Sequence, residues 1–200
     1  NRINPIAAAM LSQLVNPTQP GYTYNYFVTN AYDTTYHKID AKLTYNPGPR
    51  LNLNARLGFL PSWERSAGIL PSVDGSEINP LSQGRVFDSF VNSHSIGATS
   101  ILSSNFVVDG SFGFTKHDVN VFPPSAECYG NRFGIPNACQ PPYSLDTNVP
   151  DMTVTGWVLN GQSPIRDYVD PQWQFVGNAG WTRGSHNIKF GLDYIILNQD

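Results

Sequence analysis

Charged residues are scarce in this sequence, since Lys, Arg, Asp and Glu make up 14% of its 200 residues, against roughly 25% in an ordinary soluble domain. It contains only four lysines and carries a net charge of −3. A surface that binds nucleic acid needs clustered basic residues, so we exclude nucleic acid as a partner. Long apolar runs are missing too. The run at residues 6–11 is far shorter than the roughly 20 residues of a membrane-crossing helix, which excludes a helical membrane protein.

Glycine, proline and aromatic residues are plentiful instead. The chain holds 17 Gly and 16 Pro, and 12% of it is Phe, Trp or Tyr. This composition is typical of many short strands joined by turns, and it predicts an all-β protein. A membrane β-barrel is compatible with this composition, because its strands need no long apolar run.

The two cysteines, Cys128 and Cys139, lie in a stretch rich in Gly, Pro and Asn. Neither has the spacing of a metal site or of a C-x-x-C motif. The favoured interpretation is a disulfide that closes a surface loop in an oxidising compartment. Two free thiols are the alternative.

Residues 1–35 predict one short helix followed by a loop. Asn4 can cap a helix with Pro5 in its first turn, and the Asn-Pro pair at 16–17 ends it. The apolar face of this helix consists of Ile6, Met10 and Leu14.

Further along, the hydrophobic period changes to two. Residues 38–45 and 51–59 alternate apolar and polar side chains without a break, whereas residues 91–101 alternate poorly. Because alternate side chains on a strand point to opposite faces, each hairpin has one apolar and one polar face. The pattern predicts hairpins at 36–59, 91–115 and 172–197.

The connections between these strands are of two kinds. Turns within a hairpin are short, whereas residues 60–90 and 116–171 form long loops. In a meander, alternate connections leave from opposite ends of the strands, so one rim carries turns and the other carries loops. This is typical of outer-membrane barrels, with short periplasmic turns and long extracellular loops. We therefore expect an antiparallel up-and-down meander, part of an outer-membrane β-barrel. A soluble β-sandwich would show the same alternation and is the alternative.

Each face of the hairpins has a predicted role. Aromatic residues at the strand ends fall on the apolar face, where they would form the two interfacial girdles of a barrel: Tyr45, Phe59, Phe106, Phe114, Trp173, Trp181 and Tyr194. The polar face would line a wet lumen with Lys38, Asp40, Lys42, Asn52, Asn54, Arg56, Asp109, Gln172, Gln174, Asn178, Lys189 and Asp193.

No motif of an active site, cofactor site or metal centre is present among the histidines and cysteines. We therefore expect no enzyme activity, no cofactor and no metal. Residues 146–151 supply oxygen donors that could hold Ca²⁺. Capping of Asx-type turns by these side chains is the favoured interpretation.

Residues 181–194, WTRGSHNIKFGLDY, resemble the W-x-x-G-x-H-x-I-K-F-G-x-D hairpin of TonB-dependent receptors with an Oar-like β-barrel. The opening NRINPIA is similar to the N-R-I-x-P-x-A segment of that family. Residues 25–26 and 40–45 fit its N-Y loop and its D-x-K-x-x-Y strand. The resemblance covers most of the chain in order and spacing.

This resemblance implies a wide barrel of about two dozen strands in the cell outer membrane, with this chain as a middle portion of its wall. It also implies a plug domain, expected outside these residues, through which the TonB energy-transducing complex would act. The expected partners are outer-membrane lipid, that complex and a transported ligand of unknown identity. The alternative is a non-transporting, adhesin-like surface barrel or an extracellular carbohydrate-binding β-sandwich.

Overall fold

The computed structural model describes residues 3–22, 24–75, 79–82, 84–125, 127–138, 152–154, 157–159 and 165–198. The contacts within the chain separate it into two compact units. The sheet unit comprises Tyr36–Ser62, Ser89–Val119 and Asp167–Asp200. The loop unit comprises Asn1–Thr35, Trp63–Asp88 and Asn120–Arg166.

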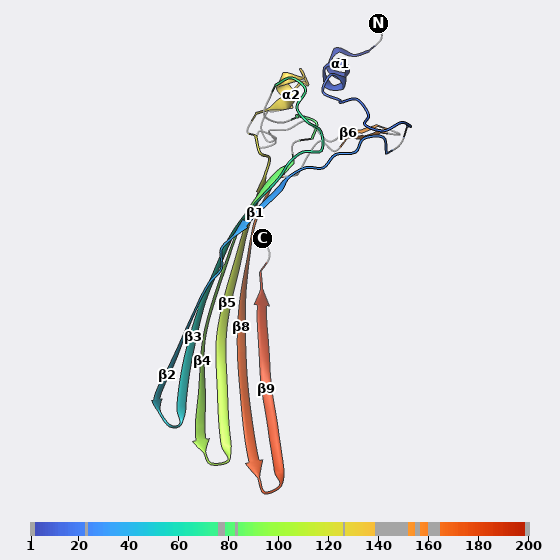
Figure 1. Ribbon diagram of the computed structural model, residues 1–200. Helices are drawn as coiled ribbons and strands as arrows, with labels where there is room; N and C mark the ends of the chain where they lie inside the picture. The colour runs from blue at the N-terminus through green and yellow to red at the C-terminus, as the bar shows by residue number, and fades with distance from the viewer. Residues whose placement is uncertain are drawn as a thin grey trace. The chain divides into compact units, whose positions relative to one another are not determined.

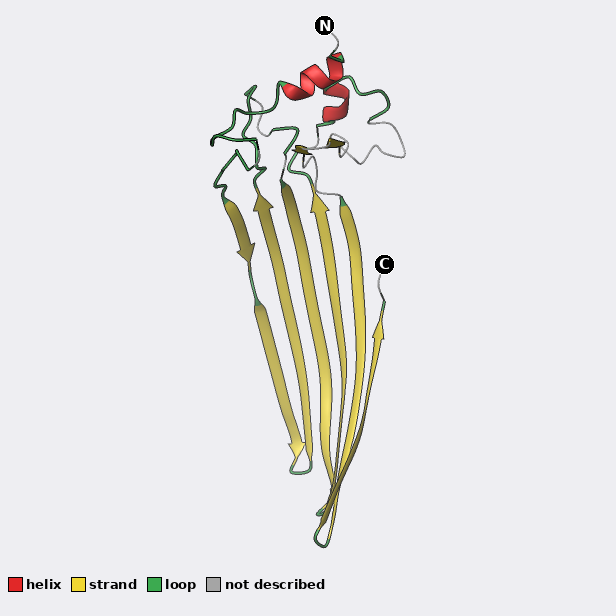
Figure 2. Cartoon of the chain, turned by 90° about the vertical axis from the view of Figure 1, so that its right-hand side faces the viewer, coloured by secondary structure: helices red, strands yellow, loops and turns green. Residues whose placement is uncertain are grey.

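Seven strands form one sheet in the order β1-β3-β4-β5-β8-β9, with β2 also paired to β3. Their bounds are β1 (Tyr32–Tyr36), β2 (Ile39–Gly48), β3 (Leu51–Ser66), β4 (Arg85–Ser103), β5 (Phe106–Phe122), β8 (Arg166–Arg183) and β9 (His186–Leu197). Tight turns join the strands of each hairpin, as Figures 1 and 2 show. The predicted all-β meander is confirmed. Within the described residues the sheet does not close on itself.

The alternating sequence determines which face each side chain occupies. In the β2–β3 pair, Leu43 lies opposite Ala55 on one face, and Lys42 lies opposite Arg56 on the other. Because the register from Ile39 to Tyr45 pairs odd residues with odd ones, the apolar residues of this stretch and their partners in β3 reach the same side. The hairpin therefore has an apolar and a polar surface.

The β8–β9 pair repeats this arrangement at the other edge of the sheet. Ala179 lies opposite Phe190, and the next pair, Gly180 and Lys189, faces the other way. In this hairpin odd residues of β8 pair with even residues of β9, which preserves the separation of apolar from polar residues. The two hairpins thus follow the same pattern.

The strands continue beyond the ends that the alternation predicts. β3 extends to residue 66 and β5 to 122, while β4 begins at 85 and β8 at 166. The predicted loops 60–90 and 116–171 therefore shrink to 67–84 and 123–165. Proline explains the error in β3 and β8, because Pro61 and Pro171 lie within these two extensions.

Both prolines are tolerated because the neighbouring strand is broken or ends beside them. The Pro61 carbonyl accepts a hydrogen bond from the backbone N–H of His37, which lies in the gap between β1 and β2, at 3.0 Å. The Pro171 carbonyl accepts one from the Asn198 N–H just after β9 ends, at 3.1 Å. The missing N–H of proline therefore removes no bond from a continuous ladder.

The segments predicted as helix and loop contain more regular structure than expected. Residues 32–35, assigned to the first loop, belong to strand β1. The second long loop contains the short helix α2 (Tyr129–Arg132) and two paired strands, β6 (Met152–Val154) and β7 (Trp157–Leu159). These elements are too short to leave a clear period in the sequence.

Helix α1 (Pro5–Leu11) begins as predicted. The Asn4 side chain accepts a hydrogen bond from the Ile6 N–H at 2.8 Å, and Pro5 lies in the first turn. The helix ends at Leu11 rather than at the Asn-Pro pair. Neither helix in the described part of the chain is long and apolar enough to cross a membrane.

The hydrophobic core of the loop unit joins three segments that are distant in sequence. Met10 of α1 packs with Leu81, Tyr129 and Phe133, all of them buried. The Ile6 and Leu14 side chains pack against this cluster, so the predicted apolar face of the helix is the one that is buried. The loops of this unit are therefore folded on one another.

Candidate functional site

The apolar face of the sheet unit is exposed. The exposed fractions are 69% for Leu43, 61% for Ile96, 58% for Phe190 and 70% for Leu192. In a β-sandwich the corresponding side chains would be buried between two sheets. The sandwich alternative is therefore wrong, and this face has the apolar, open character of a surface that contacts lipid.

Aromatic rings form a continuous band across four strands on this face. The ring of Phe59 lies 5.5 Å from that of His94, His94 lies 6.4 Å from Phe114, and Phe114 lies 5.6 Å from Trp173. These separations are within the range of favourable aromatic contacts. Phe90 joins the band through Phe59, at 6.3 Å. Such a band suits the membrane interface, where amphipathic rings gather.

The other predicted girdle residues share this face. Tyr45 lies opposite Leu53, Trp181 lies opposite Ile188, and Tyr194 lies opposite Phe175. Phe106 falls on the same side, because it is an even number of residues from Phe114 along β5.

The polar face carries charges that pair across strands. Asp40 of β2 accepts a hydrogen bond from Arg56 of β3 at 2.9 Å and lies 3.4 Å from the ammonium group of Lys38. Gly58 makes room for this carboxylate, since a Cβ there would lie 2.7 Å from the Ser93 hydroxyl and 3.2 Å from Asp40. This part of the face is packed closely around its charges.

The same chemistry continues toward β9. Gln174 donates to the Asp193 carboxylate at 2.9 Å, and Asn178 donates to Asp109 at 2.8 Å. Both pairs join neighbouring strands and are open to solvent. The polar face is therefore a hydrogen-bonded wall that carries charges of both signs.

A family model described as an outer membrane beta barrel domain matches residues 1–200. The chain belongs to this family. It is therefore a barrel domain of the cell outer membrane. No curated protein matches the sequence.

The remaining predicted lumen residues of this barrel domain also lie on its polar face. Asn54 lies opposite Thr44, Lys189 lies opposite Gly180, and Lys42 lies opposite Arg56. Asn52 and Gln172 are the last two of the predicted lumen residues. Asn52 donates a hydrogen bond to Asn46 at 2.6 Å, and Gln172 lies opposite Leu197.

No pattern in the sequence predicts a second polar cluster on this face of the barrel domain. The buried hydroxyl of Ser89 lies 2.8 Å from Nε2 of His117, and the His117 ring meets the edge of Tyr168 at 6.3 Å. The neighbouring Asp118 turns to the opposite face and pairs with Lys116 at 2.8 Å. Only the three-dimensional pairing of β4, β5 and β8 brings the first three residues together.

Phe90 and His94 were also missed as members of the aromatic band. The strand that contains them was predicted to begin at residue 91 and alternates poorly, because its apolar face includes Asn92, His94 and Ser100. The contacts of His94 with Phe59 and Phe114 identify its face. No hydropathy signal could have done so.

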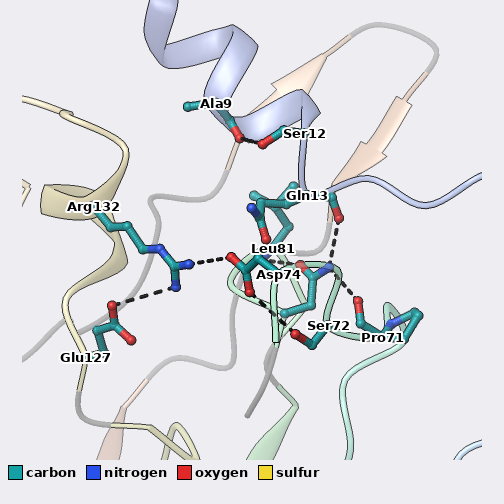
Figure 3. Close-up of polar contacts among 10 residues, drawn as sticks. Ala9, Ser12, Gln13, Pro71, Ser72, Asp74, Leu81, Glu127 and Arg132 are labelled. Carbon is teal, nitrogen blue, oxygen red and sulfur yellow. Dashed lines mark hydrogen bonds and ion pairs between the residues drawn. The ribbon is translucent and has the colours of Figure 1, made fainter. Parts of the chain in front are cut away.

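In the loop unit, Arg132 of α2 links two segments of the barrel domain. Its guanidinium pairs with Asp74 and with Glu127, the latter at 3.8 Å, as Figure 3 shows. It also lies 5.9 Å from the centre of the Tyr129 ring. Burial raises the pKa of the Tyr129 hydroxyl, which is 2% exposed.

The buried Asn79 side chain connects segments of the same unit through hydrogen bonds. Its side-chain amide donates to the carbonyls of Gln13 and Pro71, each at 2.8 Å, and its oxygen accepts from the Leu81 N–H at 2.9 Å. Because Asn79 is 1% exposed, water cannot replace these bonds.

Two predictions for the loops fall partly outside the described residues. Cys128 is disulfide-bonded, whereas its predicted partner Cys139 lies outside them, as do residues 146–151. Among the residues that the structure does describe, no three His, Cys, Asp or Glu side chains lie close enough together to hold a metal ion.

Proposed function

We propose that this barrel domain forms part of the wall and outer loops of a TonB-dependent transporter. The polar face of the sheet unit would line a water-filled lumen, and residues 67–84 and 123–165 would lie on the extracellular side. The observation that carries the proposal is the chemistry of the polar face. Asp40–Arg56 and Asn178–Asp109 are paired across strands yet remain open to solvent.

Charged groups that pair across strands and stay exposed to solvent suit the hydrated wall of a wide barrel. Small barrels, in contrast, fill their interior with packed side chains. Mixed signs on the wall favour no single charge of the transported ligand. The dependence on TonB is supported by the resemblance of the β8–β9 hairpin to the corresponding hairpin of that receptor family.

A second candidate is a non-transporting surface barrel that binds partners through its loops. The core of Met10, Leu81, Tyr129 and Phe133 favours it, because pre-folded loops offer a rigid binding surface. The two candidates differ in whether energy from the inner membrane is used.

The test is to purify the full-length protein and measure its binding to the soluble periplasmic domain of TonB. A TonB-dependent transporter should bind this domain, and liposomes that contain the protein should not leak small solutes, because the plug closes the lumen. The matched control is the same protein without its plug segment, which should leak and lose TonB binding.

Each other outcome identifies a different function. Leakage from the intact protein would indicate an open pore. Absence of both leakage and TonB binding would favour the surface-binding barrel.

A further inference from the structure

A groove of about 560 Å³ lies on the apolar face of the sheet unit, across strands β2 to β5. Tyr45, Ile96 and Phe112 are its bulky lining residues. Its floor consists of the small residues Ala55, Ala98 and Gly110. Large side chains around small ones thus produce a hollow in the apolar surface.

The groove is part of the surface that contacts the membrane. Ala55 lies opposite Leu43 on the apolar face, and the Phe112 ring lies 4.9 Å from that of Phe175 on the same face. The aromatic band that includes Phe114 continues this surface along β5. Because the chain is an outer-membrane barrel domain, the groove opens onto lipid.

The protein itself does not require the glycine in the floor. A Cβ at Gly110 would lie 3.5 Å from the Val176 carbonyl oxygen, which is an ordinary van der Waals distance. Glycine inside a strand often marks the close approach of a ligand. The absence of a side chain at Gly110 therefore leaves the groove deeper than another residue would.

The groove lies toward the hairpin turns. Tyr45 and Leu53 flank the turn that contains Arg50. Short turns of outer-membrane barrels face the periplasm, where the membrane leaflet presents phospholipid headgroups. As a residue of this turn, the cationic Arg50 would lie near the level of those phosphates, and the hydroxyl of Tyr45 suits the same interface.

We propose that this groove binds one acyl chain of a phospholipid from the periplasmic leaflet. Its apolar lining suits methylene groups, and its position toward the turn that contains Arg50 suits a lipid with an anionic phosphate. A second protein chain would instead need a broad interface of roughly 800 Å² per partner. The inference rests on the outer-membrane location and not on the transport proposal.

The test compares the full-length protein with two groove-filling variants, Ala55→Leu and Ala98→Leu. Each protein is equilibrated with vesicles of phosphatidylethanolamine, extracted in mild detergent and examined by native mass spectrometry for retained lipid. Filling the floor should lower the retained lipid about tenfold, which corresponds to the lost burial of roughly two methylene groups.

Ala179→Leu is the matched control. Ala179 lies opposite Phe190 on the same apolar face, outside the groove lining. This variant should retain the lipid of the unaltered protein, and resistance of all three variants to unfolding in detergent confirms that they are folded.

Two results would overturn the proposal. Equal lipid retention by all folded variants would show that the groove does not bind an acyl chain. Cross-linking of two copies through residues of the groove would assign it to a protein interface. Because TonB binding is measured separately, loss of that binding leaves the lipid result unaffected.

Discussion

A charged substitution on β9 tests whether the apolar face of the sheet contacts lipid. Phe190 lies on the exposed apolar side, four residues after the start of β9, near the middle of the roughly 9–11 residues that cross the hydrocarbon layer. Phe190→Arg should destabilise the folded barrel by about 2–4 kcal/mol, because it places a charge in lipid. Urea titrations of folding into phospholipid vesicles measure this free energy.

The control for this substitution is Asn54→Arg on the polar face. Asn54 lies opposite Thr44 and beside the already charged residues Lys42 and Arg56. An arginine there should be tolerated, since water reaches it. Equal losses of stability at the two positions would contradict the assignment of the faces.

In the loop unit, we expect the substitution of Asn79 to lower the local stability. Asn79→Ala leaves the carbonyls of Gln13 and Pro71 without their buried donor. The local stability of the loop unit should fall by about 1–3 kcal/mol, which hydrogen exchange of the loop amides measures.

Asn25→Ala is the matched comparison for Asn79→Ala. The Asn25 side chain donates a solvent-exposed hydrogen bond to the Gly21 carbonyl at 3.0 Å in the same unit. Its loss should change stability by no more than about 0.5 kcal/mol. If both substitutions had the same effect, the buried bonds of Asn79 would not be what holds the segments together.

At the level of elements, Cys128, the residue before α2, is disulfide-bonded. With Cys139 as the predicted partner, the oxidised chain should be lighter than the reduced chain by two hydrogen atoms. Reduction should destabilise the loop unit by about 3 kcal/mol, since it releases a loop of this length. Protease digestion followed by mass spectrometry measures both effects.

The sheet unit gives the internal control for reduction. Its hairpins contain no cysteine, so digestion of β2–β3 and β8–β9 should be unchanged while the loops are cleaved faster. Quantitative reaction of both thiols before reduction would show that no disulfide forms.

For the molecule as a whole, the backbone groups at the edges of the sheet need hydrogen-bond partners in a membrane. In the described residues, β9 pairs only with β8, so its other side has unpaired backbone groups. Each such group costs several kcal/mol in lipid. We therefore expect a strand from outside these residues to pair with β9 and close the barrel.

Hydrogen exchange of the full-length protein in vesicles tests this closure. All amides of β9 between Ile188 and Tyr194 should exchange slowly, because each is bonded to one neighbour or the other. Rapid exchange at alternate residues would show that the edge stays open.

Individual residues show which parts of the sheet the sequence could predict and which it could not. Leu43, Lys42 and Phe190 were placed on the correct faces, since strict alternation leaves a strand only one way to bury or expose them. Pro61 and Pro171 misled the prediction, because a gap in the neighbouring strand is invisible in the sequence. His94 and Ser89 were missed, because their partners come from other strands.

The sequence by itself therefore determined the meander, the two chemically different faces and the capped first helix, since these depend on residues close along the chain. Only the tertiary structure decided the aromatic band, the Ser89–His117 contact, the groove and the packing of the loops around Met10 and Tyr129. These features join segments tens of residues apart. Local periodicity specifies the face of a strand, whereas strand pairing and loop packing specify its neighbours.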